Sequence, residues 1–313
     1  MSKNQSSGQE EKAGNSKLNA VAWGTILIIT VPQIIYRLFV PRMPGEPSIP
    51  IWIAGAEVGI LAILCLICWV WSTIKPLRGF ILAILAIYVG HFFIIPYIYE
   101  SVTLSSWMQQ ATWGVRLVVF NLLLKHMVLV LLMVLTLIGS VIGRKELFLV
   151  RGNIKALFKP IRFLPDTSGG RPTSWTRFIL SFLPPFVIVC GIIMAFQIRP
   201  SMSQLYKVLI FLPAITIGAS INAFSEEFEY RSVLLARLLP VLGSNSAVLM
   251  SSVFFGLMHY LGGTPGGPVG AFLTGFLGFL MAKSMIETRG FVWAFLIHFV
   301  ADFVLFCGMA TLT

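Results

Sequence analysis

Long apolar stretches separated by short polar segments dominate this sequence. A membrane-spanning helix needs about 20 largely apolar residues. About nine stretches meet this requirement, and eight is an equally good count. We predict helices in all of them, because a backbone in lipid must satisfy its hydrogen bonds within its own segment. The candidate spans are residues 20–40, 51–74, 79–98, 117–143, 178–197, 205–224, 246–262, 268–286 and 291–312.

A further apolar-periodic stretch, residues 226–240, differs from the others because charges interrupt it. Its charged residues are Glu226, Glu227, Glu229, Arg231 and Arg237. Charges at this density are too costly to face lipid. We expect this segment to lie at the membrane interface or to line a water-filled cavity.

The composition agrees with a chain embedded in lipid. Of its 313 residues, 57% are hydrophobic and 11% are charged, whereas about 25% are charged in an ordinary soluble domain. This excess of apolar residues excludes a soluble monomer, because much of the surface of any compact fold stays exposed. The expected fold class is therefore all-α, a polytopic integral membrane protein with about eight to nine transmembrane helices.

Positive charge is concentrated between the apolar stretches. The net charge is +11, and residues 144–177 hold eight Lys and Arg residues against two acids. Cytoplasmic loops of membrane proteins carry such an excess, so we place this loop and the N-terminus in the cytoplasm. We assign the charge to topology and to contact with lipid head groups, and not to nucleic acid.

The basic loop suggests a division of the chain into four parts, with a boundary near residue 170. Residues 1–17 are expected to form a solvated cytoplasmic tail, and residues 18–143 the N-terminal transmembrane helices. Residues 144–177 are the basic cytoplasmic loop, and residues 178–313 form a C-terminal membrane domain. We find no internal repeat between the two halves, which disfavours the inverted-repeat plan of many secondary transporters.

Ionisable residues inside membrane spans are costly, so their positions are informative. In the N-terminal half they are isolated from one another, as Glu57, His91, Lys125 and His126. For each of them we favour a hydrogen bond between helices or a side chain that reaches toward the interface.

The C-terminal half instead concentrates polar residues in three short motifs. In the first, Glu227 and Arg231 are four residues apart on one helix face and can pair, while Glu226 points about 100° away and is available for another partner. In the second, Phe255 and His259 are also four residues apart. The ring can therefore shield one face of the imidazole from water.

The third motif places His298 and Asp302 on one face of a spanning helix, where a carboxylate needs a partner. Together the motifs supply a carboxylate and an imidazole that can activate water, and a second polar pair that can hold an oxyanion. Two other assemblies use the same residue types. One is a zinc site of His259, His298 and Glu226, which lacks a His-Glu-x-x-His helix, and the other is a proton or ion relay.

In their order and spacing, the motifs resemble those of the CPBP family. This family comprises CaaX proteases and bacteriocin-processing enzymes, is also called the Abi family, and includes the Rce-type prenyl-protein endopeptidases. The motifs here are Glu226-Glu227-x-x-x-Arg231, Phe255-x-x-x-His259 and His298-x-x-x-Asp302. The resemblance covers roughly residues 175–313 and implies an all-helical core with a membrane cavity that opens to the cytoplasmic side.

The resemblance also implies a role for each motif residue. Carried over by motif position, Glu226 and His259 would bind and activate the hydrolytic water. His298 and the residue four positions later, Asp302, would stabilise the oxyanion. The supporting residues would be Glu227, Arg231 and Phe255.

Asp302 departs from the CaaX branch of the family, whose members have Asn at this position. An Asn amide donates hydrogen bonds at any pH, whereas an ionised Asp only accepts them. Asp302 can donate when protonated, or it can orient His298 as the acid of a catalytic triad does; we favour the second role. The resemblance is therefore to the wider family, and prenylated substrates are not implied.

We therefore expect a hydrolase, namely a glutamate-type intramembrane endopeptidase. Its substrate would be a membrane-associated or lipidated protein or peptide, and it would need no cofactor, although the residue types also suit zinc. The alternatives are a non-catalytic membrane scaffold or immunity-type binding protein of the same fold, and an ion-relay transporter. The short tail and Asp302 favour a bacterial plasma membrane over the endoplasmic reticulum.

Overall fold

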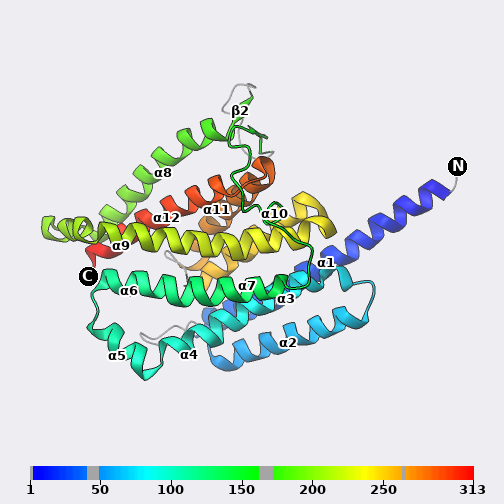
Figure 1. Cartoon of the computed structure of the whole chain (residues 1–313), viewed down its shortest axis with the longest axis horizontal. Helices are drawn as coiled ribbons and strands as arrows, with labels where there is room; N and C mark the ends of the chain where they lie inside the picture. The colour runs from blue at the N-terminus through cyan, green and yellow to red at the C-terminus, as the bar shows by residue number, and fades with distance from the viewer. Residues whose placement is uncertain (1–2, 41–48, 162–171, 263–265) are drawn as a thin grey trace. The chain divides into compact units, whose positions relative to one another are not determined.

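The computed structural model describes residues 3–40, 49–161, 172–262 and 266–313. Nearly all of this part of the chain is helical (Figure 1), which confirms the all-α class. Eight of its helices or helical runs are long and apolar enough to cross a membrane, so the chain is an integral membrane protein. They are Ser16–Phe39, Ile51–Val70, Lys75–Tyr99, Trp113–Leu137, Trp175–Ile198, Met202–Gly262, Gly267–Thr288 and Val292–Thr311.

Two of the nine predicted spans fall within the single helical run Met202–Gly262, which has 61 residues. The run comprises α9 (Met202–Glu227), the π-helical segment η4 (Phe228–Val233) and α10 (Leu234–Gly262). A straight helix of this length would measure about 90 Å, three times a hydrocarbon core of about 30 Å. Gly243 interrupts the run with φ 77° and ψ 172°, a conformation that residues with a Cβ rarely adopt. The run is therefore not one straight span.

The chain folds into two compact units. Unit 1 consists of Met1–Ile94, Leu132–Ile142 and Glu229–Phe279, and unit 2 consists of Ile95–Leu131, Gly143–Phe228 and Leu280–Thr313. Both units combine segments from the N-terminal and C-terminal halves of the sequence, because the chain passes between them several times.

Unit 1 is built around the long N-terminal helix. α1 (Lys3–Phe39) packs against α10 and α2 (Ile51–Val70), and α3 (Arg78–Val89) packs against α2 and α10. The start of α11 (Gly267–Thr288) lies close to α10, since a Cβ added at Gly256 would lie 3.0 Å from the Gly275 Cα. Glycine permits this backbone approach. The short elements η1 (Lys75–Leu77) and η2 (Gly90–Ile94) flank α3.

Unit 2 is organised around α9. Along α9 pack α12 (Val292–Thr311), α6 (Trp113–Val119) and the π-helical segment η3 (Phe120–Val130), and α8 (Trp175–Ile198) packs on α12 (Figure 1). Ile215 and Ala219 of α9 form a buried cluster with Phe306 and Ala310 of α12. The other helices of unit 2 are α4 (Ile95–Tyr99) and α5 (Val102–Gln110), whereas α7 (Leu131–Leu137) falls in unit 1 except for its first residue. This packing brings polar residues of η3, α9 and α12 into reach of one another.

The basic loop is bonded to the turn between α11 and α12. The Asn153 amide donates to the Thr288 carbonyl at 2.7 Å, and the Trp293 Nε1 donates to the Ile154 carbonyl at 3.0 Å. An antiparallel pair of short strands, β1 (Leu157–Phe158) and β2 (Thr173–Ser174), follows. The expected boundary near residue 170 lies outside the described residues.

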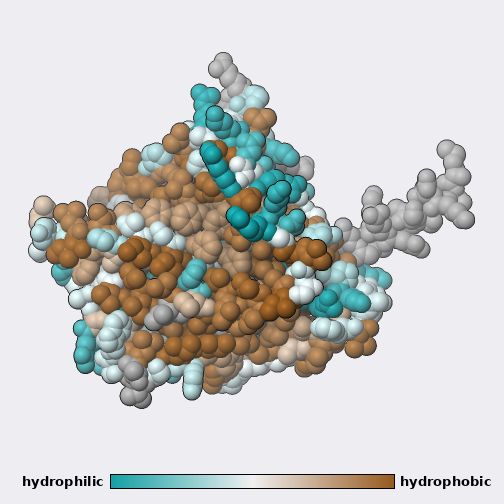
Figure 2. Space-filling model, viewed as in Figure 1, coloured by the Kyte–Doolittle hydropathy of each residue, from teal (hydrophilic) through white to brown (hydrophobic). Residues whose placement is uncertain are grey.

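The surface of unit 2 has an apolar part, which suits lipid, and a polar part, which suits water. Figure 2 shows hydrophobic residues over α8 and α9, and hydrophilic residues gathered over the segment that carries β2. On α8, for example, Leu180, Ile188 and Phe196 are 69%, 59% and 75% exposed. Apolar side chains in this number outside a core are those of a helix that faces lipid.

Candidate functional site

The first motif lies at the C-terminal end of α9. A capping box formed by Ser201 and Gln204 starts this helix, which then continues to Glu227. Glu226 and Glu227 are both buried, with exposures of 6% and 0%. Adjacent buried carboxyl groups in an apolar helix need polar partners, and unit 2 supplies them from α12 and η3.

His298 on α12 contacts both glutamates. Its Nδ1 lies 2.7 Å from Glu227 Oε1, and its Nε2 lies 3.5 Å from Glu226 Oε2. An ionised carboxylate only accepts hydrogen bonds, so the Glu227 contact places a proton on Nδ1. The Nε2 atom also lies 3.6 Å from Asp302 Oδ2. His298 is thus held at one nitrogen and directs the other toward two carboxylates.

The spacing on α12 favours Asp302 as the residue that orients His298. In the structure Glu227, which the sequence pairs with Arg231, makes the shorter contact with the ring. Glu227 comes from a different helix, so a search for pairs within one helix does not find it. Asp302 instead accepts a hydrogen bond from Asn222 Nδ2 at 2.8 Å.

Two residues of this cluster, Lys125 and Asn222, are not identified as site residues by the sequence motifs. Lys125, on η3, donates from Nζ to Glu226 Oε1 at 2.6 Å and to Asn222 Oδ1 at 2.7 Å. Asn222 stands one helical turn before Glu226 on α9 and links Lys125 to Asp302. Their signals were a lysine within an apolar span and an amide at i−4 from the motif glutamate. Neither signal reveals the partner.

The second motif lies in unit 1. His259 Nδ1 is 2.8 Å from the Phe255 carbonyl oxygen, which can only accept, so Nδ1 carries a proton and the neutral ring keeps its lone pair on Nε2. The Phe255 and His259 ring centroids are 4.2 Å apart, as the spacing predicted. The Arg231 guanidinium carbon lies 3.8 Å from the Phe255 ring centroid, and Arg231 is fully buried.

The structure therefore assembles the predicted site residues in two groups. Glu226, Glu227, His298 and Asp302 come together in unit 2, joined by Asn222 and Lys125. The second group, in unit 1, consists of Arg231, Phe255 and His259.

The other ionisable residues of the N-terminal spans also bond to neighbouring elements, as the sequence suggested. Glu57 Oε2 accepts a hydrogen bond from Gln33 Nε2 at 2.6 Å, and His91 Nε2 lies 3.4 Å from Glu229 Oε2. His126 Nδ1 lies 3.2 Å from a serine hydroxyl on α9. These are helix-to-helix contacts, whereas Lys125 reaches the motif glutamate itself.

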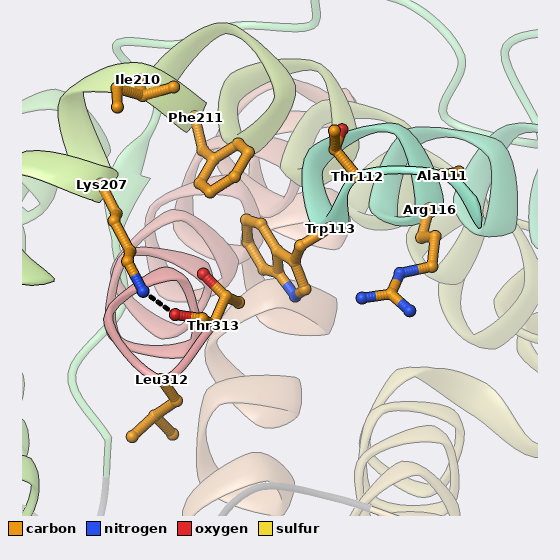
Figure 3. A pocket seen from close by; sticks show the side chains of 9 residues that line it. All are labelled: Ala111, Thr112, Trp113, Arg116, Lys207, Ile210, Phe211, Leu312 and Thr313. Atoms are coloured by element: carbon orange, nitrogen blue, oxygen red, sulfur yellow. Dashed lines mark hydrogen bonds between the residues drawn. The ribbon is translucent and has the colours of Figure 1, made fainter. Parts of the chain in front are cut away.

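A cavity of about 580 Å³ lies in unit 2, and none of its lining residues belongs to the cluster around Glu226. Figure 3 shows Lys207 bonded to Thr313 there, and Trp113 and Arg116 from the start of α6. Phe211, which also lines it, precedes Glu226 by 15 residues on α9, about 22 Å along a helix. The cavity contains no predicted site residue. It is lined by Ala111, Thr112, Trp113, Arg116, Lys207, Ile210, Phe211, Leu312 and Thr313.

The chemistry available to the unit 2 cluster is proton transfer. It combines carboxylates, an imidazole and an ammonium group within hydrogen-bond or ion-pair distance of one another. Among the described residues, no group of three or more His, Cys, Asp or Glu side chains is arranged to hold a metal ion.

Comparison with known proteins supports the motif assignment. Residues 208–304 match a family model described as type II CAAX prenyl endopeptidase Rce1-like. This segment is somewhat under a third of the chain and contains every motif residue. The resemblance found from the motifs is thus confirmed over this segment, and it supports a membrane endopeptidase of the CAAX-protease type. No curated protein and no solved structure matched the chain.

Proposed function

We propose that this protein is a glutamate-type intramembrane endopeptidase, in which Glu226 and His259 activate the water that cleaves a peptide bond. The observation that carries the proposal is the buried cluster of Glu226, Glu227, His298 and Asp302 within the segment that matches the endopeptidase family. Burying this many ionisable groups in lipid-embedded helices is costly. A function in proton transfer explains why the protein nevertheless has them there.

In the proposed reaction Glu226 is the general base. As a carboxylate it accepts a proton from a water that the His259 imidazole helps to bind, and the resulting hydroxide attacks the peptide carbonyl carbon. His298, when protonated at both nitrogens, donates from Nε2 to the oxyanion that forms. The proton on Glu226 then passes to the leaving nitrogen as the C–N bond breaks, which restores the carboxylate and releases an acid and an amine.

Glu227 and Asp302 would act through His298. Glu227 holds Nδ1 at 2.7 Å, which sets the direction in which Nε2 points. Asp302, at 3.6 Å from Nε2, stabilises the doubly protonated ring, as the acid of a catalytic triad does. Phe255 would support the second motif by packing on the His259 ring, and Arg231 would support it by packing on the Phe255 ring.

The proposal also includes a class of substrate and the membrane in which the protein lies. We propose a membrane-associated or lipidated protein or peptide that enters a cavity open to the cytoplasmic side, with the N-terminus and residues 144–177 on that side. The positive charge of this loop supports the orientation. A bacterial plasma membrane is the proposed location, and catalysis is proposed to need no metal.

A proton relay is the second candidate function. It is favoured by the continuous polar chain in which Lys125 bonds to Asn222, Asn222 bonds to Asp302, and Asp302 lies beside His298. Such chains carry protons in membrane pumps. A relay would change ion flux across vesicles and would produce no cleaved protein.

The test compares new protein termini in membranes of cells that express the wild type or Glu226→Gln. This variant keeps the size of the side chain and removes the base. The matched control is Glu57→Gln, another buried acid of a membrane helix, which bonds to Gln33 and lies outside the matched segment. Termini that appear with the wild type and the control but not with Glu226→Gln support the endopeptidase. Identical termini in all three samples, at equal amounts of folded protein, contradict it.

A further inference from the structure

Lys125 is the member of the unit 2 cluster that lies outside the segment matched by the family model. Its side chain is 21% exposed, and the Glu226 side chain that it meets is 7% exposed. A lysine can extend its ammonium group to the interface, where water solvates it. Here the ammonium group instead turns inward and donates to Glu226 at 2.6 Å and to Asn222 at 2.7 Å.

The Asn222 amide is oriented by the charges on its two sides. Its oxygen accepts from the Lys125 ammonium, and its nitrogen donates to the Asp302 carboxylate. The reversed amide would place NH₂ against the ammonium and oxygen against the carboxylate, and neither contact is a hydrogen bond. Lys125 thus reaches Glu226 directly and Asp302 through one amide.

The cluster needs a positive charge. From α9 it contains Glu226 and Glu227, from α12 it contains Asp302 and His298, and from η3 it contains Lys125. Carboxylates that are this buried repel one another and are expensive to ionise without a cation. His298 carries a full positive charge only when it is protonated, whereas Lys125 is an ammonium donor with no acceptor.

We propose that Lys125 is the counter-charge of this cluster: it positions Glu226 and, through Asn222, allows Asp302 to stand beside Glu226 as a second carboxylate. The N-terminal half of the chain therefore contributes a positioning residue to the site. The consequence for catalysis rests on the proposed function, but the consequence for folding does not.

The folding test is a double-mutant cycle between Lys125 and Asp302. Thermal unfolding of the whole protein in lipid nanodiscs would be measured for Lys125→Met, Asp302→Asn and the double variant. We expect Lys125→Met to lower the unfolding temperature by roughly 5 °C in the wild-type background, and by less than half of that when Asp302→Asn has removed the charge. Lys125→Arg, which keeps the charge, is expected to stay near the wild type.

The matched control for the cycle is Asn121→Leu. Asn121 is also a buried polar residue of η3, but it donates to the Leu117 carbonyl of its own helical run at 2.8 Å. Its effect on unfolding is expected to be the same with and without Asp302→Asn. If the effect of Lys125→Met is likewise the same in both backgrounds, the proposal is overturned. If Lys125→Met yields no folded protein, the double variant is still expected to fold, because Asp302→Asn removes one of the charges that Lys125 neutralises. If neither variant folds, the proposal is overturned.

The catalytic test uses the peptide sequence found by terminus mapping as its substrate. We expect Lys125→Met to lower kcat roughly 10- to 100-fold with little change in KM, and to move the acidic limb of the pH–rate profile to higher pH, because the base has lost its cation. Lys125→Arg should restore much of the rate and the wild-type pH limb. A purely structural role would leave the pH profile unchanged in the folded fraction.

The two tests separate the two proposals. A wild type without cleavage activity that still shows coupling between Lys125 and Asp302 would contradict the endopeptidase and support the counter-charge. An active wild type without coupling, and with an unchanged pH profile in Lys125→Met, would support the endopeptidase and overturn the counter-charge.

Discussion

Two buried polar clusters, one around Glu57 in unit 1 and one around Glu226 in unit 2, differ in the ionisable groups that they place in lipid-embedded helices. In unit 1, Glu57 of α2 accepts a hydrogen bond from Gln33 of α1, and Tyr88 of α3 donates to the Ile29 carbonyl at 2.7 Å. In unit 2, carboxylates, an imidazole and an ammonium group meet from three elements. The first cluster has one acid with a neutral donor, and the second has several acids with an imidazole and an ammonium group.

This is the difference expected between a structural role and the proposed chemical role. Hydrogen bonds between a carboxyl group, an amide and a phenol tie three helices together, and such bonds stabilise membrane proteins by about 1 kcal/mol each. Catalysis by proton transfer needs an acid and a base within reach of a reacting group. The unit 2 cluster meets that requirement and the unit 1 cluster does not, so substitutions should affect them differently.

The largest effect is expected from His298→Ala in unit 2. Loss of the Nε2 donor to the oxyanion should lower kcat by about 10³-fold. The measurement is the cleavage rate of purified protein in nanodiscs, normalised to the folded fraction. A rate within threefold of the wild type would show that His298 is only a packing residue.

Glu227→Gln is expected to have a smaller effect on the same reaction. The amide oxygen can still accept from His298 Nδ1, but the negative charge that stabilises the protonated ring is lost. We expect kcat to fall roughly 10- to 100-fold with KM nearly unchanged, because the role is to position and charge the imidazole. Steady-state kinetics on the same peptide measures kcat and KM separately. A rise in KM with an unchanged kcat would indicate that Glu227 contacts the substrate instead.

In unit 1, Gln33→Leu should affect folding and not chemistry. It removes the donor to Glu57 Oε2, which is 2.6 Å away, and leaves a buried carboxyl group without that bond. The expected cost is about 1–3 kcal/mol of unfolding free energy, measured by denaturation in detergent micelles. Gln33→Leu combined with Glu57→Leu should recover most of this loss. A large fall in kcat of the folded Gln33→Leu variant would break the distinction between the two clusters.

The smallest effect is expected from metal removal. Since a Glu226-activated water needs no Lewis acid, incubation with 1,10-phenanthroline or EDTA should leave the cleavage rate within about twofold of the untreated enzyme. The assay would include a zinc-dependent peptidase as a positive control for chelation. Loss of activity that added zinc restores would replace the proposed mechanism with a metal-dependent one.

The spans and the motifs could be predicted because their signals are local. An apolar run of about 20 residues has few alternatives to a membrane helix. The Phe255–His259 contact follows from a spacing of four residues on one helix. The break at Gly243 also has a local signal, since Gly243-Ser244-Asn245 is a run of residues that favours turns.

The remaining contacts could not be predicted because they join elements that are distant in sequence. Lys125 and Glu226 are 101 positions apart, and His298 and Glu227 are 71 positions apart. Which helix faces lie against each other depends on packing, and one sequence does not reveal packing partners. The sequence therefore predicts for Lys125 only a hydrogen bond between helices or a side chain that reaches toward the interface, whereas in the structure it bonds to the motif glutamate.

The measurement that tests Glu226 as the hydrolytic base most directly is cleavage in ¹⁸O-labelled water. Purified wild type and Glu226→Gln would be reconstituted in vesicles with the peptide found by terminus mapping, and the products analysed by mass spectrometry. Hydrolysis by an activated water predicts one ¹⁸O atom in the new carboxyl terminus with the wild type and no product with the variant. Equal product from both proteins, or a product without the label, would contradict the proposed mechanism.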